Sequence, residues 1–147
     1  MPPTSPHPQA TDPAAGERAQ VELRLPAAGA YATIVRTTAA GLAARLDFTI
    51  DEIEDLRIAI GEATALVIPE ADAGADLSCR FHVATGSMTV ELETQAVHAP
   101  DVDRDSFAWQ VLVTLAEGVE AASSGGLLRV RFTVRSQVPA GKTGAAR

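Results

Sequence analysis

Apolar and polar residues alternate in four short segments of the chain. The first covers Val21 to Leu25, and the same period of two recurs over residues 77–83, 88–92 and 128–134. Alternation at this period is typical of strands with one buried face and one solvated face. Pro26 is expected to end the first strand, and Thr85-Gly86-Ser87 is expected to form the turn of a hairpin between the second and third strands.

Apolar residues at helical spacing predict two helices between the first and second strands. The first helix covers residues 28–46, and the second runs from about residue 50 to Ile68, where Pro69 ends it. Thr49 and Glu52 have the spacing of a capping box at the start of the second helix. The predicted buried faces are Ile34, Val35, Leu42 and Leu46 in the first helix, and Ile53, Leu56, Ile60, Ala63 and Val67 in the second.

A third helix is predicted from Phe107 to about Ala122, with Asp105 or Ser106 as its N-cap and Gly125-Gly126 at its end. The element order is then β-α-α-β-β-α-β. Because every strand has one apolar face only, the helices should cover one side of an antiparallel or mixed sheet. The pattern therefore predicts an α+β fold, a two-layer α/β sandwich.

The composition predicts one folded domain with a tail at each end. Proline is frequent in residues 1–18, and small polar residues and glycine dominate 136–147, so we expect both segments to be disordered. Residues 19–135 then form the domain. Of the 147 residues 46% are hydrophobic, which is enough for a core, although only 4% are aromatic.

Charge and apolar run length exclude two classes of partner. The net charge of −7 repels phosphate backbones, so we expect no direct binding to nucleic acid. No apolar run approaches the ~20 residues that span a bilayer, and the N-terminus does not resemble a secretory signal. The single cysteine, Cys79, permits no internal disulfide and is expected to be a buried small hydrophobic residue. A cytoplasmic protein fits these features best.

Glu62 is the residue with the clearest chemical potential. The common phosphate-binding and nucleophile motifs are absent, and His7, His82 and His98 are not at metal-ligand spacing and are expected to be ordinary surface histidines. Glu62 lies beside Asp55 at the edge of the second helix's apolar stripe. Such a carboxylate either polarises a hydroxyl or a water, or simply pairs with a nearby arginine, and the residues alone leave both readings open.

The segment from Asp55 to Ala63 reads D-L-R-I-A-I-G-E-A and resembles the same helix of RsbW-type anti-sigma factors, bacterial serine kinases of the GHKL ATP-binding class. The element order and the opening strand V-E-L-R-L-P extend the resemblance to about residues 20–135. Residues 106–112, S-F-A-W-Q-V-L, are similar to a stretch of actinobacterial members that hold stress or sporulation sigma factors. The resemblance implies a Bergerat (GHKL-like) fold.

The resemblance also shows where the ATP site should be and what this chain lacks there. Glu62 takes the position of the family's glutamate, which orients the attacking hydroxyl, but Leu66 replaces the asparagine that holds Mg²⁺. An alkyl group cannot coordinate Mg²⁺, which takes oxygen ligands. The family's glycine box falls on residues 93–101, which contain no glycine, and no glycine-rich lid precedes the last strand. We therefore expect weak or absent ATP binding, with no cofactor, and a vestigial Glu62.

The partner surface is what the resemblance leaves in place. Arg36 aligns with a family arginine that contacts the sigma factor, although a plain solvated arginine is the alternative. Trp109 lies off the face formed by Phe107, Val111 and Leu115, so it either anchors a partner or packs against the rim of the sheet. The polar-face row Arg129, Arg131 and Arg135 is expected to be solvated.

Three functions follow from these observations and remain open at this point. The first is a degenerate anti-sigma factor that sequesters a sigma factor and is released by an anti-anti-sigma protein of the STAS type. The second is an active serine kinase that uses ATP and Mg²⁺, with Glu62 as base, to phosphorylate that antagonist. The third is a GHKL-like domain with a role outside transcription. A homodimer is compatible with each of them.

Overall fold

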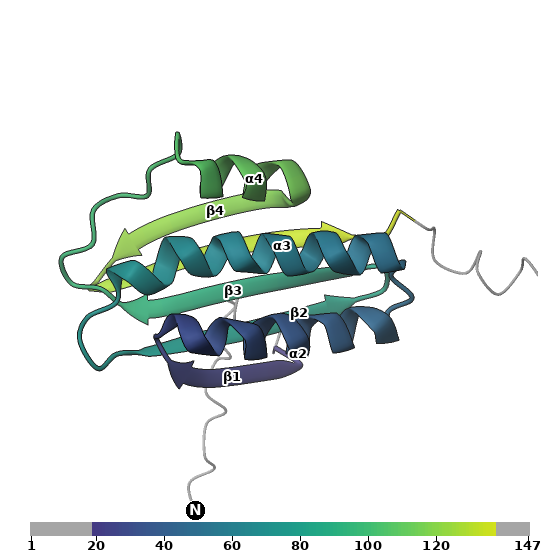
Figure 1. Ribbon diagram of the computed structural model, residues 1–147, viewed down its shortest axis with the longest axis horizontal. Helices are drawn as coiled ribbons and strands as arrows, with labels where there is room; N and C mark the ends of the chain where they lie inside the picture. Colours follow the sequence, from purple (N-terminus) through teal and green to yellow (C-terminus); the bar gives the residue numbers. More distant parts are fainter. Residues whose placement is uncertain (1–18, 138–147) are drawn as a thin grey trace, which may run out of the picture.

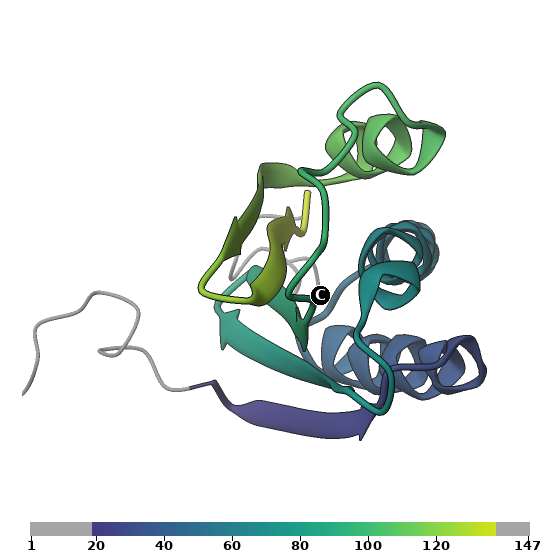
Figure 2. The same ribbon diagram turned by 90° about the vertical axis from the view of Figure 1, so that its left-hand side faces the viewer.

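The computed structural model describes residues 19–137 and contains a five-stranded antiparallel sheet with three α-helices on one face (Figures 1 and 2). The strand order is β1-β2-β3-β5-β4. The predicted tail 1–18 and residues 138–147 of the predicted tail 136–147 lie outside the described residues. Ser136 and Gln137 are described and bond to Glu52, so for these two residues the predicted disorder was wrong. The strands are β1 (Val21–Pro26), β2 (Asp76–Ala84), β3 (Ser87–Gln95), β4 (Glu117–Ser124) and β5 (Leu127–Arg135). The helices are α2 (Ala32–Arg45), α3 (Ile50–Val67) and α4 (Phe107–Leu115), with 3₁₀ turns η1 (Gly29–Tyr31) and η2 (Ile68–Glu70). The predicted two-layer α+β sandwich is therefore confirmed.

The core lies between the sheet and the helical layer, where the strand alternation directs one set of side chains inward. On β2, β3 and β5 every second residue is buried, and the polar residues between them face away from the helices. Helix α3 meets this surface with the apolar stripe predicted for it. The inward residues are Leu77, Cys79, Phe81, Met88, Val90, Leu92, Leu128, Val130 and Phe132 from the sheet, and Leu56, Ile60, Ala63 and Val67 from α3.

Helix α3 begins at the predicted capping box. The Glu52 amide donates to Thr49 Oγ1 at 3.1 Å, and the Thr49 amide donates to Glu52 Oε1 at 2.8 Å. Two amides that the helix itself leaves without partners are thereby satisfied. At the other end Pro69 stands in η2, directly after the helix. The boundaries of α3 were therefore predictable from local sequence.

Helix α2 uses a smaller buried face than the one predicted. Val35, Ala39 and Ala43 are completely buried, whereas Ile34 is 44% exposed. The prediction placed Ile34 on the buried face, and for that residue it was wrong. Alanines at two of these three positions let α2 lie close to α3, so small size as well as hydrophobicity selects the inward face.

The predicted third helix is too long, because its second half forms strand β4. Helix α4 ends at Leu115, and the backbone of Ala116 is already extended. Gly118 has a φ of +60° and lies at an irregularity in the pairing of β4 with β5. Gly125 and Gly126, with φ of +61° and +79°, form the turn between the two strands. Two consecutive residues with positive φ are characteristic of a tight hairpin. The element order is therefore β-α-α-β-β-α-β-β, and Gly125-Gly126 is a hairpin turn, not a helix end.

Candidate functional site

Glu62 and Leu66 lie one helical turn apart near the C-terminal end of α3. Figures 1 and 2 show α3 between α2 and α4 on the same side of the sheet. Gly61 faces α2, because a Cβ built on it would lie 3.8 Å from Arg36 Nη1. Each residue turns the helix by about 100°, so Glu62 and Leu66 lie on the flank of α3 away from α2, the flank along which α4 packs. The candidate base and the residue at the expected metal-ligand position therefore share one side of the helix.

The environments of these two side chains differ. Leu66 is half-buried and packs against the core. Glu62 is also half-buried, and it forms no hydrogen bond or ion pair with any residue between 19 and 137. The nearby arginine that would make Glu62 a structural carboxylate is thus not in place.

Arg36 lies on the opposite flank of α3. Its Nη2 donates a hydrogen bond to Thr33 Oγ1 at 3.0 Å, one turn earlier on α2, and its Nη1 lies over Gly61. The side chain is half-buried, and it has no carboxylate partner among the described residues. The structure therefore holds Arg36 in the seam between α2 and α3, against Gly61, and Glu62 points about 100° further around the helix.

Trp109 is part of the packed face of α4. It is 8% exposed, and the guanidinium of Arg104 covers its ring at 5.1 Å from the centroid. Arg104 is held in turn by Asp101 at 3.3 Å and by the carbonyl of Ala121 at 3.3 Å. A partner could reach the indole only after Arg104 moved.

The aromatic residue that α4 does expose is Phe107, at 77%. Sequence analysis placed Phe107, Val111 and Leu115 on the main face and Trp109 off it. The observed buried residues are Trp109 and Leu112, so this orientation was wrong. The helix has only nine residues, and seven of them are apolar, so periodicity gives little information about its rotation.

The loop that follows β3 is closed by contacts within the chain. The Ala96 amide donates to the carbonyl of Gly126 at 2.8 Å, and the Val97 amide donates to the Asp72 carboxylate at 3.2 Å. Val97 itself is 63% exposed. The segment in the position of the family's glycine box is therefore an ordered connection, bonded to the β4–β5 turn and to Asp72 before β2.

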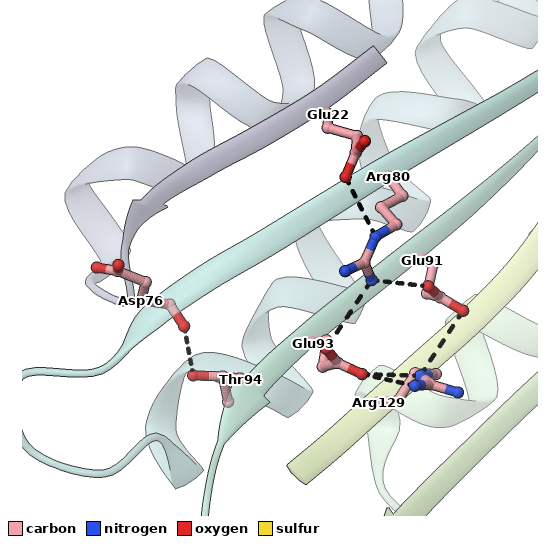
Figure 3. Close-up of polar contacts among 7 residues, drawn as sticks. All are labelled: Glu22, Asp76, Arg80, Glu91, Glu93, Thr94 and Arg129. Atoms are coloured by element: carbon pink, nitrogen blue, oxygen red, sulfur yellow. Dashed lines mark hydrogen bonds and ion pairs between the residues drawn. The ribbon is translucent and has the colours of Figure 1, made fainter. Parts of the chain in front are cut away.

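The helix-free face of the sheet carries a network of ion pairs (Figure 3). Arg80 pairs with Glu22 at 3.4 Å and with Glu91 at 3.1 Å, and Arg129 pairs with Glu93 at 2.7 Å. The hydrogen bond to Glu93 raises the pKa of Arg129. The predicted solvated arginine row is therefore only partly a free surface, since Arg129 is paired here and Arg135 pairs with Glu117.

Two other residues with potential chemistry, Cys79 and His82, lie on β2. Cys79 is buried as predicted, and burial raises the pKa of its thiol to about 12, so it remains protonated. His82 is half-buried on β2, and its Nδ1 is enclosed without a hydrogen-bond partner.

No three His, Cys, Asp or Glu side chains between residues 19 and 137 are grouped so that they could hold a metal ion. Nor does this part of the chain contain a helix that is both long and apolar enough to cross a membrane.

A sheet covered on one face by α2, α3 and α4 is the class of fold found in a solved RsbW-containing structure. The crystal structure of the RsbU and RsbW domains of Rv1364c from Mycobacterium tuberculosis matches 82% of this chain and 34% of that chain, with a TM-score of 0.59 and 16% sequence identity. At that identity the match shows the fold. No family model matches the chain.

Sequence comparison also finds RsbW proteins. The serine-protein kinase RsbW of Halalkalibacterium halodurans is 34% identical over 88 residues, which are 59% of this chain and 52% of the relative. The RsbW of Bacillus subtilis is 41% identical over 66 residues, 43% of this chain and 41% of that protein. The chain thus spans about half the length of the curated relatives it matches. The predicted resemblance to RsbW-type proteins is confirmed.

Proposed function

We propose that this protein is an anti-sigma factor that sequesters an alternative RNA polymerase sigma factor and binds ATP weakly or not at all. Release would come from a STAS-type anti-anti-sigma protein that competes for the same surface. Such a role places the protein in the cytoplasm. The observation that carries the proposal is the pairing of an RsbW-type fold and sequence with Leu66, one turn after Glu62.

The residues at the expected nucleotide site do not fit Mg²⁺-ATP. Mg²⁺ takes oxygen ligands, and Leu66 supplies none because its side chain is an alkyl group that packs against the core. The loop from Ala96 to Ser106 contains no glycine, although close approach of backbone to an adenine or a phosphate depends on that residue. Sequestration needs only a complementary protein surface, and neither change removes that.

Arg36 is the first residue that we assign to this surface. Its guanidinium lies in the α2–α3 seam without a carboxylate partner among the described residues, so its charge is available to a protein that docks there. Arginine is enriched in interfaces, where it forms directional hydrogen bonds. Trp109 remains a candidate partner contact, on the condition that Arg104 is displaced from its ring.

An active serine kinase is the second candidate. It is favoured by the relatives, which are serine-protein kinases, and by Glu62, which has no ion-pair partner among the described residues. A base of this kind would accept the proton of an attacking hydroxyl. In that case Glu62→Ala should abolish phosphate transfer, whereas it should leave sequestration nearly unchanged.

The test is affinity capture with the purified full chain against each alternative sigma factor of the host, without added nucleotide. We expect one sigma factor to be retained. Arg36→Ala should weaken its retention, and Arg45→Ala, an exposed arginine at the end of the same helix, serves as the matched control. Failure to retain any sigma factor would count against the proposal.

A further inference from the structure

Charge is distributed unevenly between the two sides of the molecule. Within residues 19–137, the strand positions that alternate with the core carry six carboxylates and five guanidiniums, many of them joined in the network of Figure 3. The helical layer and the loops of the same residues carry the other eleven carboxylates and only four guanidiniums. The net negative charge of the folded part therefore lies outside the sheet, in the helices and the connecting segments.

The outer part of α3 carries four of these carboxylates. Asp51, Glu54, Asp55, Ile58 and Glu62 follow one another at intervals of one to four residues on the side of the helix away from the sheet. Ile58 is 45% exposed. Of the four carboxylates only Glu54 has an ion-pair partner among the described residues, Arg57 at 3.6 Å.

Like charges stand close together on this face. Asp51 repels both Glu54 and Asp55, which stand three and four residues further on the same face. Like charges at these spacings destabilise a helix by about 0.2–0.5 kcal/mol per pair. Four of the six carboxylates on the sheet face pair with arginines, whereas on the outer face of α3 only Glu54 is paired among the described residues. A positively charged partner would remove the repulsion and cover the isoleucine in one step.

We propose that the outer face of α3 is a docking surface for a lysine- and arginine-rich amphipathic helix of the partner protein. The carboxylates of Asp51 and Asp55, which are exposed, pair with its cations, and Ile58 contacts its apolar side. This inference rests on the proposed function, since the DNA-binding regions of sigma factors must be basic to bind phosphate. A second copy of the chain is excluded as the occupant, because two such faces repel each other.

The surface is separate from the Arg36 seam, and the two would act differently. Arg36 requires an acidic or carbonyl partner group, whereas α3 requires a cationic one. Long-range attraction from the acidic side accelerates encounter, and it weakens as salt increases. We therefore expect the association rate to fall with ionic strength.

The first test compares three variants of the full chain for binding of the sigma factor that affinity capture retains. Asp55→Lys should weaken binding about tenfold, because it places a like charge against the partner. Asp76→Lys changes the net charge equally, but Asp76 is an exposed residue at the start of β2 on the sheet side, so it should have little effect. Ile58→Asp separates docking from bulk attraction: the added negative charge should tighten purely electrostatic binding, whereas loss of the apolar contact should weaken docking.

The second test uses a synthetic amphipathic peptide of lysine and leucine, titrated into the isotope-labelled full chain. Amide shifts should be concentrated on residues 51–62. If Asp55→Lys and Asp76→Lys weaken binding equally, if Ile58→Asp tightens it, or if the shifts lie on the sheet face, the docking surface is wrong. Mapped peptide binding without retention of any sigma factor would instead contradict the proposed function and leave the surface intact.

Discussion

The amide of Gln137 donates a hydrogen bond to the carboxylate of Glu52, 85 positions earlier in the chain, at 2.5 Å. Glu52 also accepts from the Thr49 amide and so joins the first turn of α3 to the segment that leaves β5. Burial by itself raises the pKa of Glu52, but the hydrogen bonds from Gln137, Thr49 and Ser136 outweigh it and lower the pKa overall.

Glu52→Gln should therefore destabilise the protein in a pH-dependent way. A carboxylate whose pKa is lower in the folded state stabilises that state above its unfolded pKa, about 4.3, and the contribution disappears as the pH falls through the folded value. We expect a loss of about 1 kcal/mol at pH 7, typical of a helix cap. Urea unfolding at pH 7 and at pH 3 measures it, and a difference that stays constant between the two would contradict this explanation.

Gly61→Ala should stabilise the protein. Gly61 is in the interior of α3, where alanine is favoured by about 1 kcal/mol, and the new Cβ would lie 3.8 Å from Arg36 Nη1, an ordinary contact. Gly41→Ala in α2 is the matched control, since nothing lies within 4 Å of the added carbon. Thermal unfolding should show that the melting temperatures of both variants are higher than that of the unchanged protein, by similar amounts. A drop for Gly61→Ala alone would mean that Arg36 needs the space.

Gly126→Ala should destabilise the protein, in contrast to Gly61→Ala. Gly126 has a φ of +79° in the β4–β5 turn, and an added Cβ would lie 3.4 Å from the Val97 side chain. Alanine in the left-handed region costs about 1 kcal/mol or more, so the free energy of unfolding should fall. Unfolding with denaturant measures the change, and an unchanged or higher free energy of unfolding would contradict the positive φ of Gly126.

Leu66→Asn should not by itself create Mg²⁺-ATP binding. The substitution supplies an oxygen ligand, but the glycine-free loop after β3 is unchanged, and a polar amide then replaces a side chain that packs against the core. We expect a loss of about 1–3 kcal/mol in stability and no saturable binding of a fluorescent ATP analogue. Tight, magnesium-dependent binding by this variant would show that the loop is competent and that Leu66 alone prevents binding.

The sequence predicted the fold wherever local chemistry determines it. Thr49, Glu52 and Pro69 define α3 through hydrogen bonds and backbone limits within a few residues, and strict alternation defines β2, β3 and β5. It did not predict β4, because Glu117–Ser124 contains one β-branched residue and two alanines, and its conformation depends on pairing with β5. The same dependence on tertiary contacts hid the orientation of α4 and the burial of Trp109.

The site was predictable only in part. The spacing of Glu62 and Leu66 fixes their common flank on α3, because a helix places residues four apart together. The position of Arg36 over Gly61, and the cover of Arg104 on Trp109, depend on how separate elements pack. The acidic outer face of α3 is visible in the sequence, since its carboxylates recur at intervals of three and four residues around Ile58.

The central claim is that sequestration proceeds without nucleotide. The most direct measurement is calorimetric titration of the retained sigma factor into the full chain, first in nucleotide-free buffer and then with saturating Mg²⁺-ATP. We predict the same dissociation constant in both, and no heat when Mg²⁺-ATP is titrated alone. Binding that appears or strengthens markedly only with Mg²⁺-ATP would contradict the account and favour the kinase.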